Sequence, residues 1–224
     1  MNRFDLEMKT GDIVTQFPKA SSLFKQYKID FCCGGNRPIG EALEKRKLDK
    51  EAVLTEINQL YEETNNQDEI DWTSKSNLEL IEHIVEKHHG YLKQVLPELS
   101  KYVTKVQRVH GEAHPELTTV YTVFHQLKSE LESHLEKEES TLFPKLMDND
   151  VEAAAAIIHH FEEEHEHEGR LLELMREVTD DYAIPTGACN TYQLTYLKLD
   201  ELESDLFQHI HLENNILFPR FTAS

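Results

Sequence analysis

Four long stretches of the chain place apolar residues three and four positions apart, which is the spacing of one face of an amphipathic helix. They cover roughly 76–106, 116–141, 150–179 and 190–216, and Ser76 is the expected N-cap of the first. The breaks between them contain the turn-forming residues Gly111 and Pro115, Pro144, Asp148 and Asn149, and Pro185 and Gly187. The alternation expected of strands is absent. The pattern therefore predicts an all-α fold, an up-down-up-down four-helix bundle over 76–224.

A smaller helical unit is predicted before the bundle, over residues 1–63. One or two short helices are expected within 11–27, broken near Pro18, and Asp49 is a plausible N-cap for a further helix. The polar stretch 64–75 is interpreted as a linker, and packing of the Trp72 side chain could anchor it. With few core residues, the N-terminal unit is expected to need a partner surface.

Composition and charge limit the classes of function and partner that the chain could have. Among 224 residues there are only 8 Gly and 7 Pro, in keeping with a helical protein, and the net charge is −19. Such a charge disfavours nucleic acid or an anionic membrane as the main partner. No run of about 18 apolar residues is present, and Met1 to Asp12 has no apolar core of a signal peptide. Three cysteines do not form a disulfide framework, so a cytoplasmic location is expected.

The strongest functional signal is an internal repeat. The frame H-x3-E-x3-L-F-P occurs from His134 to Pro144 and again from His209 to Pro219, 75 residues apart. In the second and fourth helices, these His and Glu residues continue the apolar, inward-facing register. Burying carboxylates there costs several kcal/mol unless a cation compensates. Because Lys and Arg are absent from these inward positions, a bound metal is the simplest explanation.

The first and third helices should complete this site. The apolar face of the third helix selects His165 over its neighbouring histidines. On the first helix, His88 and His89 both border the apolar stripe. Periodicity slightly favours His88, whereas the spacing of the repeat favours His89. Four imidazoles and two carboxylates exceed one tetrahedral zinc and suit two iron or manganese ions. Glu86 and Glu162 remain alternative or supporting ligands, because each begins an E-x-x-H pair.

Further motifs resemble a known family over nearly the whole chain. The bundle resembles a hemerythrin-like di-iron domain, and the segment from Ile29 through Cys32 and Cys33 to Gly35 resembles the N-terminal domain of repair-of-iron-centres proteins of the ScdA type. Three phrases carry the likeness in the bundle: Leu96-Pro97-Glu98-Leu99, Lys105-Val106-x-x-Val109-His110 and Leu212-Glu213-Asn214-Asn215-x-Leu217-Phe218-Pro219.

The resemblance implies two non-haem irons and repair of iron–sulfur clusters damaged by nitrosative or oxidative stress. The implied ligands are His89, His134, Glu138, His165, His209 and Glu213, with both carboxylates bridging. Oxygen-carrying hemerythrins have a further histidine four residues after the third-helix ligand, where this chain has Gly169. The implied partners are damaged iron–sulfur proteins, with nitric oxide or oxygen as small ligands. A homodimer and an enzymatic reduction of nitric oxide are left open.

Cys32 and Cys33 are candidates for a redox role or a partner contact. The Gly-Gly that follows them would offer free amide groups able to lower a thiol pKa, although two buried structural cysteines are the alternative. Two other functions compete with cluster repair. An oxygen or redox sensor is disfavoured by the lack of a signalling or DNA-binding motif. Iron storage is disfavoured because storage needs a large protein shell.

Overall fold

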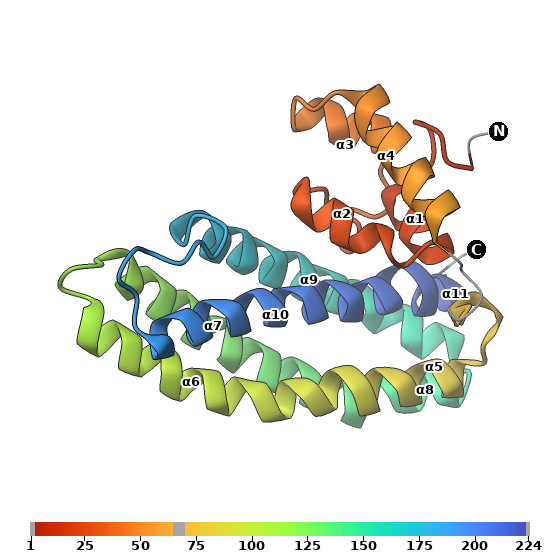
Figure 1. Cartoon of the computed structure of the whole chain (residues 1–224). Coiled ribbons are helices and arrows are strands. Elements are labelled where there is room, and N and C mark those ends of the chain that lie inside the picture. Colours follow the sequence, from red (N-terminus) through yellow and green to blue (C-terminus); the bar gives the residue numbers. More distant parts are fainter. Residues whose placement is uncertain (1–2, 65–69, 223–224) are drawn as a thin grey trace. The chain divides into compact units, whose positions relative to one another are not determined.

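The computed structural model describes residues 3–64 and 70–222, which are built from helices joined by short turns (Figure 1). Over these residues the only β-type pairing is a single bridge between Lys9 and Pro38. The chain divides into two compact units. One comprises Met1–Leu80 together with Phe207–Ser224, and the other comprises Ile81–Leu206. The all-α fold predicted from the sequence is confirmed.

The second unit contains the long helices of the bundle. They are α6 (Gly90–His110), α7 (Glu116–Lys137), α9 (Val151–Val178) and most of α10 (Asn190–Leu212). Helix α7 packs against both α6 and α9. The four predicted stretches are thus found, although the first runs four residues further, to His110, and continues through Pro97.

Three of the four long stretches are interrupted by a π-helical turn. These turns are η3 (Ile84–His89), η4 (Glu138–Leu142) and η5 (Glu213–Leu217). The short helices α5 (Asn77–His83), α8 (Phe143–Met147) and α11 (Pro219–Thr222) flank them. A π-turn holds one more residue than an α-turn and is frequently found at functional sites. Hydrophobic periodicity alone did not predict these turns.

Polar side chains cap the helices where the sequence suggested. At the start of α5, the Ser76 hydroxyl accepts from the Glu79 amide at 3.2 Å. The Glu79 carboxylate in turn accepts from the Ser76 amide at 3.0 Å, which completes a capping box. Asp49 caps α4 (Lys50–Glu63) by accepting from the Ala52 amide. The two predicted N-caps are therefore confirmed.

The first unit has its own apolar core, built around four helices. They are α1 (Thr10–Gln16), α2 (Ala20–Gln26), α3 (Ile39–Lys45) and α4. The predicted break near Pro18 separates α1 from α2. Ile210 is buried in this core, and Phe207 packs against it. The N-terminal helices therefore share their core with the last turns of α10, which fits the expectation that they need a partner surface.

Only part of the predicted linker lies within the described residues, because 65–69 fall outside them. Beyond that gap, Trp72 lies in the short 3-10 helix η2 (Trp72–Ser74). The Trp72 carbonyl accepts from the Arg220 guanidinium at 2.8 Å, so this segment is held by the C-terminal part of the same unit. The domain boundaries at 63 and 76 stay a prediction.

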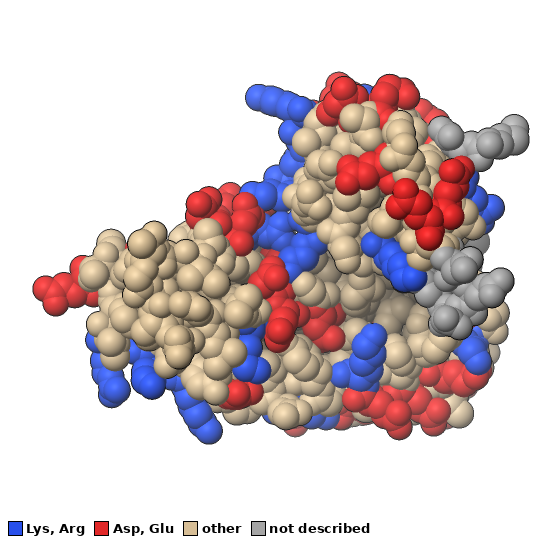
Figure 2. Space-filling model, in the orientation of Figure 1, with Lys and Arg blue, Asp and Glu red and all other residues tan. Residues whose placement is uncertain are grey.

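The surface agrees with the acidic composition. On the face shown in Figure 2, Lys and Arg side chains lie among Asp and Glu side chains instead of forming one continuous basic surface. Among the described residues, no helix combines the length and apolarity needed to cross a membrane.

Candidate metal centre

Six buried side chains form the candidate metal centre, and they are the six predicted from the sequence. His89 ends η3, His134 lies in α7, His165 in α9 and His209 in α10. Glu138 begins η4 and Glu213 begins η5. Both carboxylates have 0% exposure, and none of the four imidazoles exceeds 2%.

The six side chains fall into two groups that share both carboxylates. One group is His89, His209, Glu138 and Glu213, and the other is His134, His165, Glu138 and Glu213. Within each group, one ligand atom of every residue lies within 4.8 Å of the others. Two carboxylates common to two groups is the arrangement needed to bridge a pair of metal ions.

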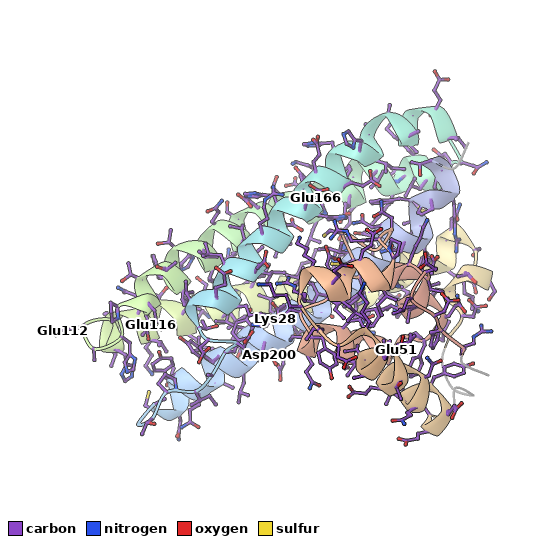
Figure 3. The ribbon with its side chains drawn as sticks, turned by 90° about the horizontal axis from the view of Figure 1, so that it is seen from above. Lys28, Glu51, Glu112, Glu116, Glu166 and Asp200 are labelled. Carbon is purple, nitrogen blue, oxygen red and sulfur yellow. The ribbon has the colours of Figure 1, made fainter. Side chains whose placement is uncertain are left out.

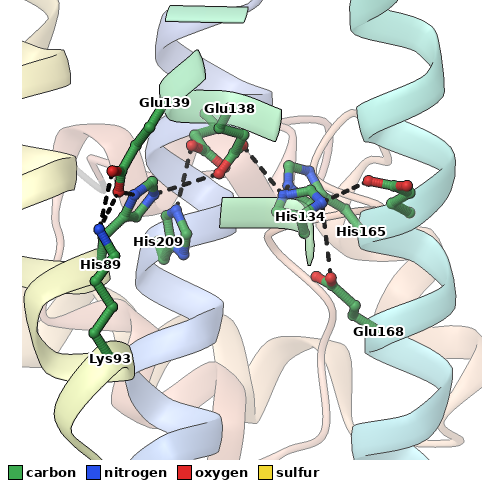
Figure 4. Close-up of polar contacts among 10 residues, drawn as sticks. His89, Lys93, His134, Glu138, Glu139, His165, Glu168 and His209 are labelled. Atoms are coloured by element: carbon green, nitrogen blue, oxygen red, sulfur yellow. Dashed lines mark hydrogen bonds and ion pairs between the residues drawn. The ribbon is translucent and has the colours of Figure 1, made fainter. Parts of the chain in front are cut away.

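Outer carboxylates orient two of the imidazoles (Figure 4). His89 Nδ1 lies 2.7 Å from Glu139 Oε1, and its Nε2 lies 3.3 Å from Glu138 Oε2. His134 Nδ1 lies 2.8 Å from Glu164 Oε2, and its Nε2 lies 3.2 Å from Glu138 Oε1. Metal-ligating histidines commonly use one ring nitrogen for such a carboxylate and the other for the metal. Both Nε2 atoms are therefore directed toward the shared Glu138.

Two of the imidazoles also approach each other. His134 Nε2 and His165 Nε2 lie 3.1 Å apart. At this distance the two nitrogens share a hydrogen bond when one of them carries a proton, and both can face the same cation when neither does. Four imidazole nitrogens and two carboxylates are also a donor set suited to iron. The residues present therefore fit a two-metal centre.

Charged neighbours keep the outer carboxylates ionised. Glu164 accepts hydrogen bonds from His134 and from Lys137, and these lower its pKa to about 2. Burial opposes ionisation of Glu139, but hydrogen bonds from Lys93 and His89 outweigh it and lower the pKa. Burial would likewise lower the pKa of His134, yet the charges of Glu138 and Glu168 raise it well above its usual value. The centre therefore attracts positive charge.

Aromatic rings close the site against solvent. Phe143 stacks on His89 with ring centroids 5.6 Å apart, and Phe161 meets His134 edge-on at 5.3 Å. Phe143 belongs to the L-F-P part of the repeated frame. The frame therefore supplies a ligand pair and also an apolar cover for a ligand contributed by another helix.

The two candidates on the first helix have different partners. His88 and His89 are both buried, but His88 Nδ1 lies 2.9 Å from Asp205 Oδ1 of α10. Only His89 belongs to a metal group. Periodicity slightly favoured His88 because it assumes a regular α-helix, whereas both residues lie within the π-turn η3, which changes the register.

The supporting residues differ from those expected. Glu86 is exposed, and Glu162 is directed to His159 on the surface of α9. The outer carboxylates within hydrogen-bond distance of the imidazoles are Glu139 and Glu164, each next in sequence to a proposed ligand, and buried Glu168 lies 3.8 Å from His134 Nδ1. The suggestion of Glu86 and Glu162 as supporting ligands was therefore wrong. Adjacency to a ligand was an available signal for both replacements, but the many other glutamates on these helices obscured it.

The cysteine pair belongs to the first unit. The Cys32 and Cys33 sulfurs lie 3.7 Å apart as thiols, and Cys32 is buried. The Asp30 carboxylate accepts from the amides of Cys32, Cys33 and Gly34. Hydrogen bonding to Cys33, together with burial and nearby negative charge, raises the pKa of Cys32 well above its usual value. The expected lowering of the Cys32 pKa is wrong because the hydrogen bond to Cys33 and burial of the thiol outweigh the opposing hydrogen bond from the Cys33 backbone.

Side chains that follow His209 in the sequence bind the backbone of the turn that carries Cys32 and Cys33. The sequence analysis did not predict these contacts. The Asn215 side-chain amide donates to the carbonyl of Cys32 at 2.9 Å. His211 Nδ1 lies 3.3 Å from the carbonyl of Phe31. A side chain at Gly35 would lie 2.6 Å from that same carbonyl, so only glycine fits. The role of Cys32 and Cys33 in redox chemistry or partner contact stays a prediction.

Comparison with known proteins agrees with this geometry. Residues 80–221 match the family described as "Hemerythrin HHE cation binding domain", and residues 6–61 match ScdA_N, described as a domain of unknown function. The first match includes every residue of both metal groups. It supports the predicted cofactor, two non-haem iron ions.

Curated relatives align over almost the whole chain. The iron-sulfur cluster repair protein ScdA of Staphylococcus haemolyticus is 36% identical over 220 residues, covering 96% of this chain and 98% of the relative. The iron-sulfur cluster repair protein YtfE of Enterobacter sp. is 38% identical over 213 residues, with 95% and 96% covered. YtfE of Escherichia coli O17:K52:H18 is 38% identical over 216 residues, with the same coverage.

Proposed function

Because the chain belongs to the hemerythrin-type iron–sulfur cluster repair proteins, we propose that it restores damaged clusters with iron from a carboxylate-bridged pair. The proposed ligands are His89, His134, Glu138, His165, His209 and Glu213. The observation that carries this proposal is the sharing of two fully buried carboxylates by two groups of ligands. Damaged iron–sulfur proteins are the corresponding clients.

The two carboxylates suit a centre from which iron can be released. Hard oxygen donors favour ferric over ferrous iron, so the ligands hold iron less tightly after reduction. Protonation of Glu138 or Glu213 removes the charge that binds the metal, and metal affinity at such a site falls with pH. Iron in this position also supplies redox chemistry and coordination sites for a small diatomic ligand.

The outer residues keep the ligands in place during release. Glu139 and Glu164 lie within hydrogen-bond distance of the Nδ1 atoms of His89 and His134, so each Nε2 stays directed inward. Lys93 and Lys137 bind the same outer carboxylates from the exposed side. The pocket can therefore lose and regain metal without rearranging its imidazoles.

Binding of nitric oxide at the same centre is the second part of the proposal. Glycine at position 169 leaves the centre one imidazole short of the oxygen carriers that the bundle resembles. More open coordination positions favour reaction with nitric oxide over reversible oxygen carriage. We extend the proposal to nitric oxide reduction as an enzymatic activity and to a homodimer as the assembly.

The test compares isosteric variants of bridging and surface glutamates. Protein purified without air should contain two irons per chain and restore activity to a nitric-oxide-damaged iron–sulfur enzyme. Glu138→Gln or Glu213→Gln should reduce the iron content by half or more and abolish restoration. Glu86→Gln and Glu162→Gln are matched controls that should behave like the parent. Full iron content in the Glu138→Gln, Glu213→Gln double variant would refute the ligand assignment.

A second measurement separates repair from sensing. The reduced protein should lose iron to a competing chelator faster than the oxidised protein. A protein that instead oxygenated reversibly, with neither nitric oxide binding nor iron transfer, would be an oxygen sensor or carrier.

A further inference from the structure

A side chain of η5 holds the turn that carries the two cysteines, residues 31–35, which we call the cysteine turn. This turn lies beyond α2 and Lys28, which is labelled in Figure 3. Asn215 Nδ2 donates to the carbonyl of Cys32 at 2.9 Å and to that of Phe31 at 3.2 Å. The proposed repair chemistry assigns no role to this asparagine.

Two glycines form the socket that receives the Asn215 side chain. A Cβ atom added at Gly11 or at Gly35 would overlap Asn215 Oδ1, so the side chain lies against bare backbone. The two glycines are joined, because the Gly11 amide donates to the Gly35 carbonyl at 2.8 Å. The Asp30 carboxylate binds three further amides of the cysteine turn. The socket is therefore a fixed piece of backbone.

Asn215 and Glu213 lie on opposite sides of η5. Successive residues of a helix are about 100° apart, so two residues of separation place these side chains about 160° apart. Glu213 faces the metal groups, and Asn215 faces the cysteine turn. One short helical turn therefore carries a bridging carboxylate on one side and its attachment on the other.

The other copy of the repeated frame is attached differently. In η4, the residue after Glu138 is Glu139, which lies 2.7 Å from His89 Nδ1 at the end of η3. Ser140, which corresponds to Asn215, is exposed. Each bridging carboxylate is thus followed by a side chain that attaches its turn to another segment. That segment is a ligand-bearing helix in the first copy and the cysteine turn in the second.

We propose that Asn215 is a positioning residue for the bridging carboxylate of Glu213, and that the cysteine turn is the support through which it acts. This inference rests on the proposed function, because it concerns the same two-iron centre. When the cysteine turn moves away from η5, Glu213 loses its support while Glu138 keeps its own, and the affinity for iron falls. The cysteine turn thereby controls how tightly the centre holds the iron that a client receives.

The first experiment measures the affinity of the full chain for ferrous iron by equilibrium competition with a chelator. Asn215→Ala removes both hydrogen bonds. Asn215→Asp keeps the size of the side chain but places a carboxylate against the two carbonyls. Both variants should bind iron at least about fivefold more weakly than the parent, the lower end of the range for coupled sites. Ser140→Ala, at the matching position, should stay within about twofold of the parent.

Asn58→Ala separates positioning from a general loss of stability. The buried Asn58 side chain binds the backbone of Phe4 and Leu54 in the same N-terminal core. This variant should unfold at a lower urea concentration than the parent and yet keep the parent affinity for iron. If Asn58→Ala weakened iron binding as much as Asn215→Ala, stability alone would explain the loss and the positioning role would be refuted.

The second experiment tests the coupling in the reverse direction. In the chain with Cys33→Ser and Cys189→Ser, buried Cys32 is the single thiol, and iodoacetamide reaches it when the cysteine turn opens. Coupling between two sites is reciprocal, so bound iron should slow this alkylation about fivefold or more. Adding Asn215→Ala should reduce that protection to less than about twofold. Equal protection in the two chains would overturn the proposal.

The outcomes also distinguish this inference from the proposed function. A parent chain without two irons, or Glu213→Gln with unchanged affinity, would show that the metal centre itself is wrong. Two irons in the parent, with the same affinity in Asn215→Ala and Asn215→Asp, would overturn the positioning role alone.

Discussion

His88 and His89 are adjacent, equally buried and chemically identical, yet their contacts differ. His89 has one nitrogen toward Glu139 and the other toward Glu138. His88 instead links α10 to the first long helix through Asp205. Residue type and burial therefore do not identify a ligand here, whereas the partner of each ring nitrogen does.

Replacing each histidine by glutamine separates these roles. His89→Gln should lower the iron content toward one per chain, because one group loses an imidazole. His88→Gln should retain both irons and lower the free energy of unfolding by about 1–3 kcal/mol, as when a buried hydrogen-bond partner is removed. Iron analysis and urea unfolding of both variants provide the check. Equal loss of iron in the two variants would contradict the register of η3.

At the scale of the element, the capped start of α5 fixes where the helix begins that leads into η3 and its proposed ligand His89. The capping box between Ser76 and Glu79 satisfies amide groups that the helix leaves unpaired. The Ser76 amide and hydroxyl, with Lys75, lower the pKa of Glu79 to about 2. Ionised Glu79 thus stabilises the folded chain.

This capping box predicts a pH dependence with a definite sign. A carboxyl whose pKa is lowered by folding contributes stability above its unfolded pKa of about 4.5. That contribution is lost as the pH falls through the folded value of about 2. Glu79→Gln should therefore destabilise metal-free protein at pH 7, and its difference from the parent should narrow below pH 4.5. Urea unfolding at several pH values tests this, with exposed Glu86→Gln as the control.

Helix positions were largely predictable from sequence, but the turns within them were not. The 3.6-residue period located all four long stretches, and the repeated frame pointed to His134, Glu138, His209 and Glu213. A π-turn adds one residue to a helical turn without changing the composition of the segment, so the sequence did not predict η3. For that reason periodicity could not decide which of His88 and His89 is the metal ligand. Outer carboxylates such as Glu164 were hidden for another reason: charged residues on a helix surface look alike until the neighbouring helix is placed.

At the scale of the whole molecule, the end of α10 serves two purposes. His209, near the end of α10, belongs to a metal group, and Glu213, the first residue of η5, belongs to both. Ile210, between them, is buried in the core of the N-terminal helices. No local pattern in the sequence revealed this shared use, because the residues that pack around Ile210 lie far earlier in the chain.

Truncation tests how far the N-terminal helices depend on that segment. A chain starting at Asp71 should fold and bind iron, but with a lower melting temperature, because Ile210 and Phe207 lose the core that covers them. Residues 1–63 alone should remain unfolded, since their core lacks Ile210. Circular dichroism and iron analysis measure these outcomes, and light scattering determines the assembly state. A truncated bundle that holds no iron would show that the N-terminal helices are required for the centre.

The π-turns let the chain carry one extra residue beside a ligand without turning the helix that follows. Because a π-turn closes with one residue more than an α-turn, deleting one residue between Glu138 and Phe143 would leave a regular α-helical turn. All the ligands would remain, and α8 would still face nearly the same direction, with Phe143 on the ring of His89. What would be lost is the local widening of the backbone next to Glu138. A relative with all the ligands but a shortened frame would therefore keep the apolar cover of the centre and differ in the backbone beside the bridging carboxylate.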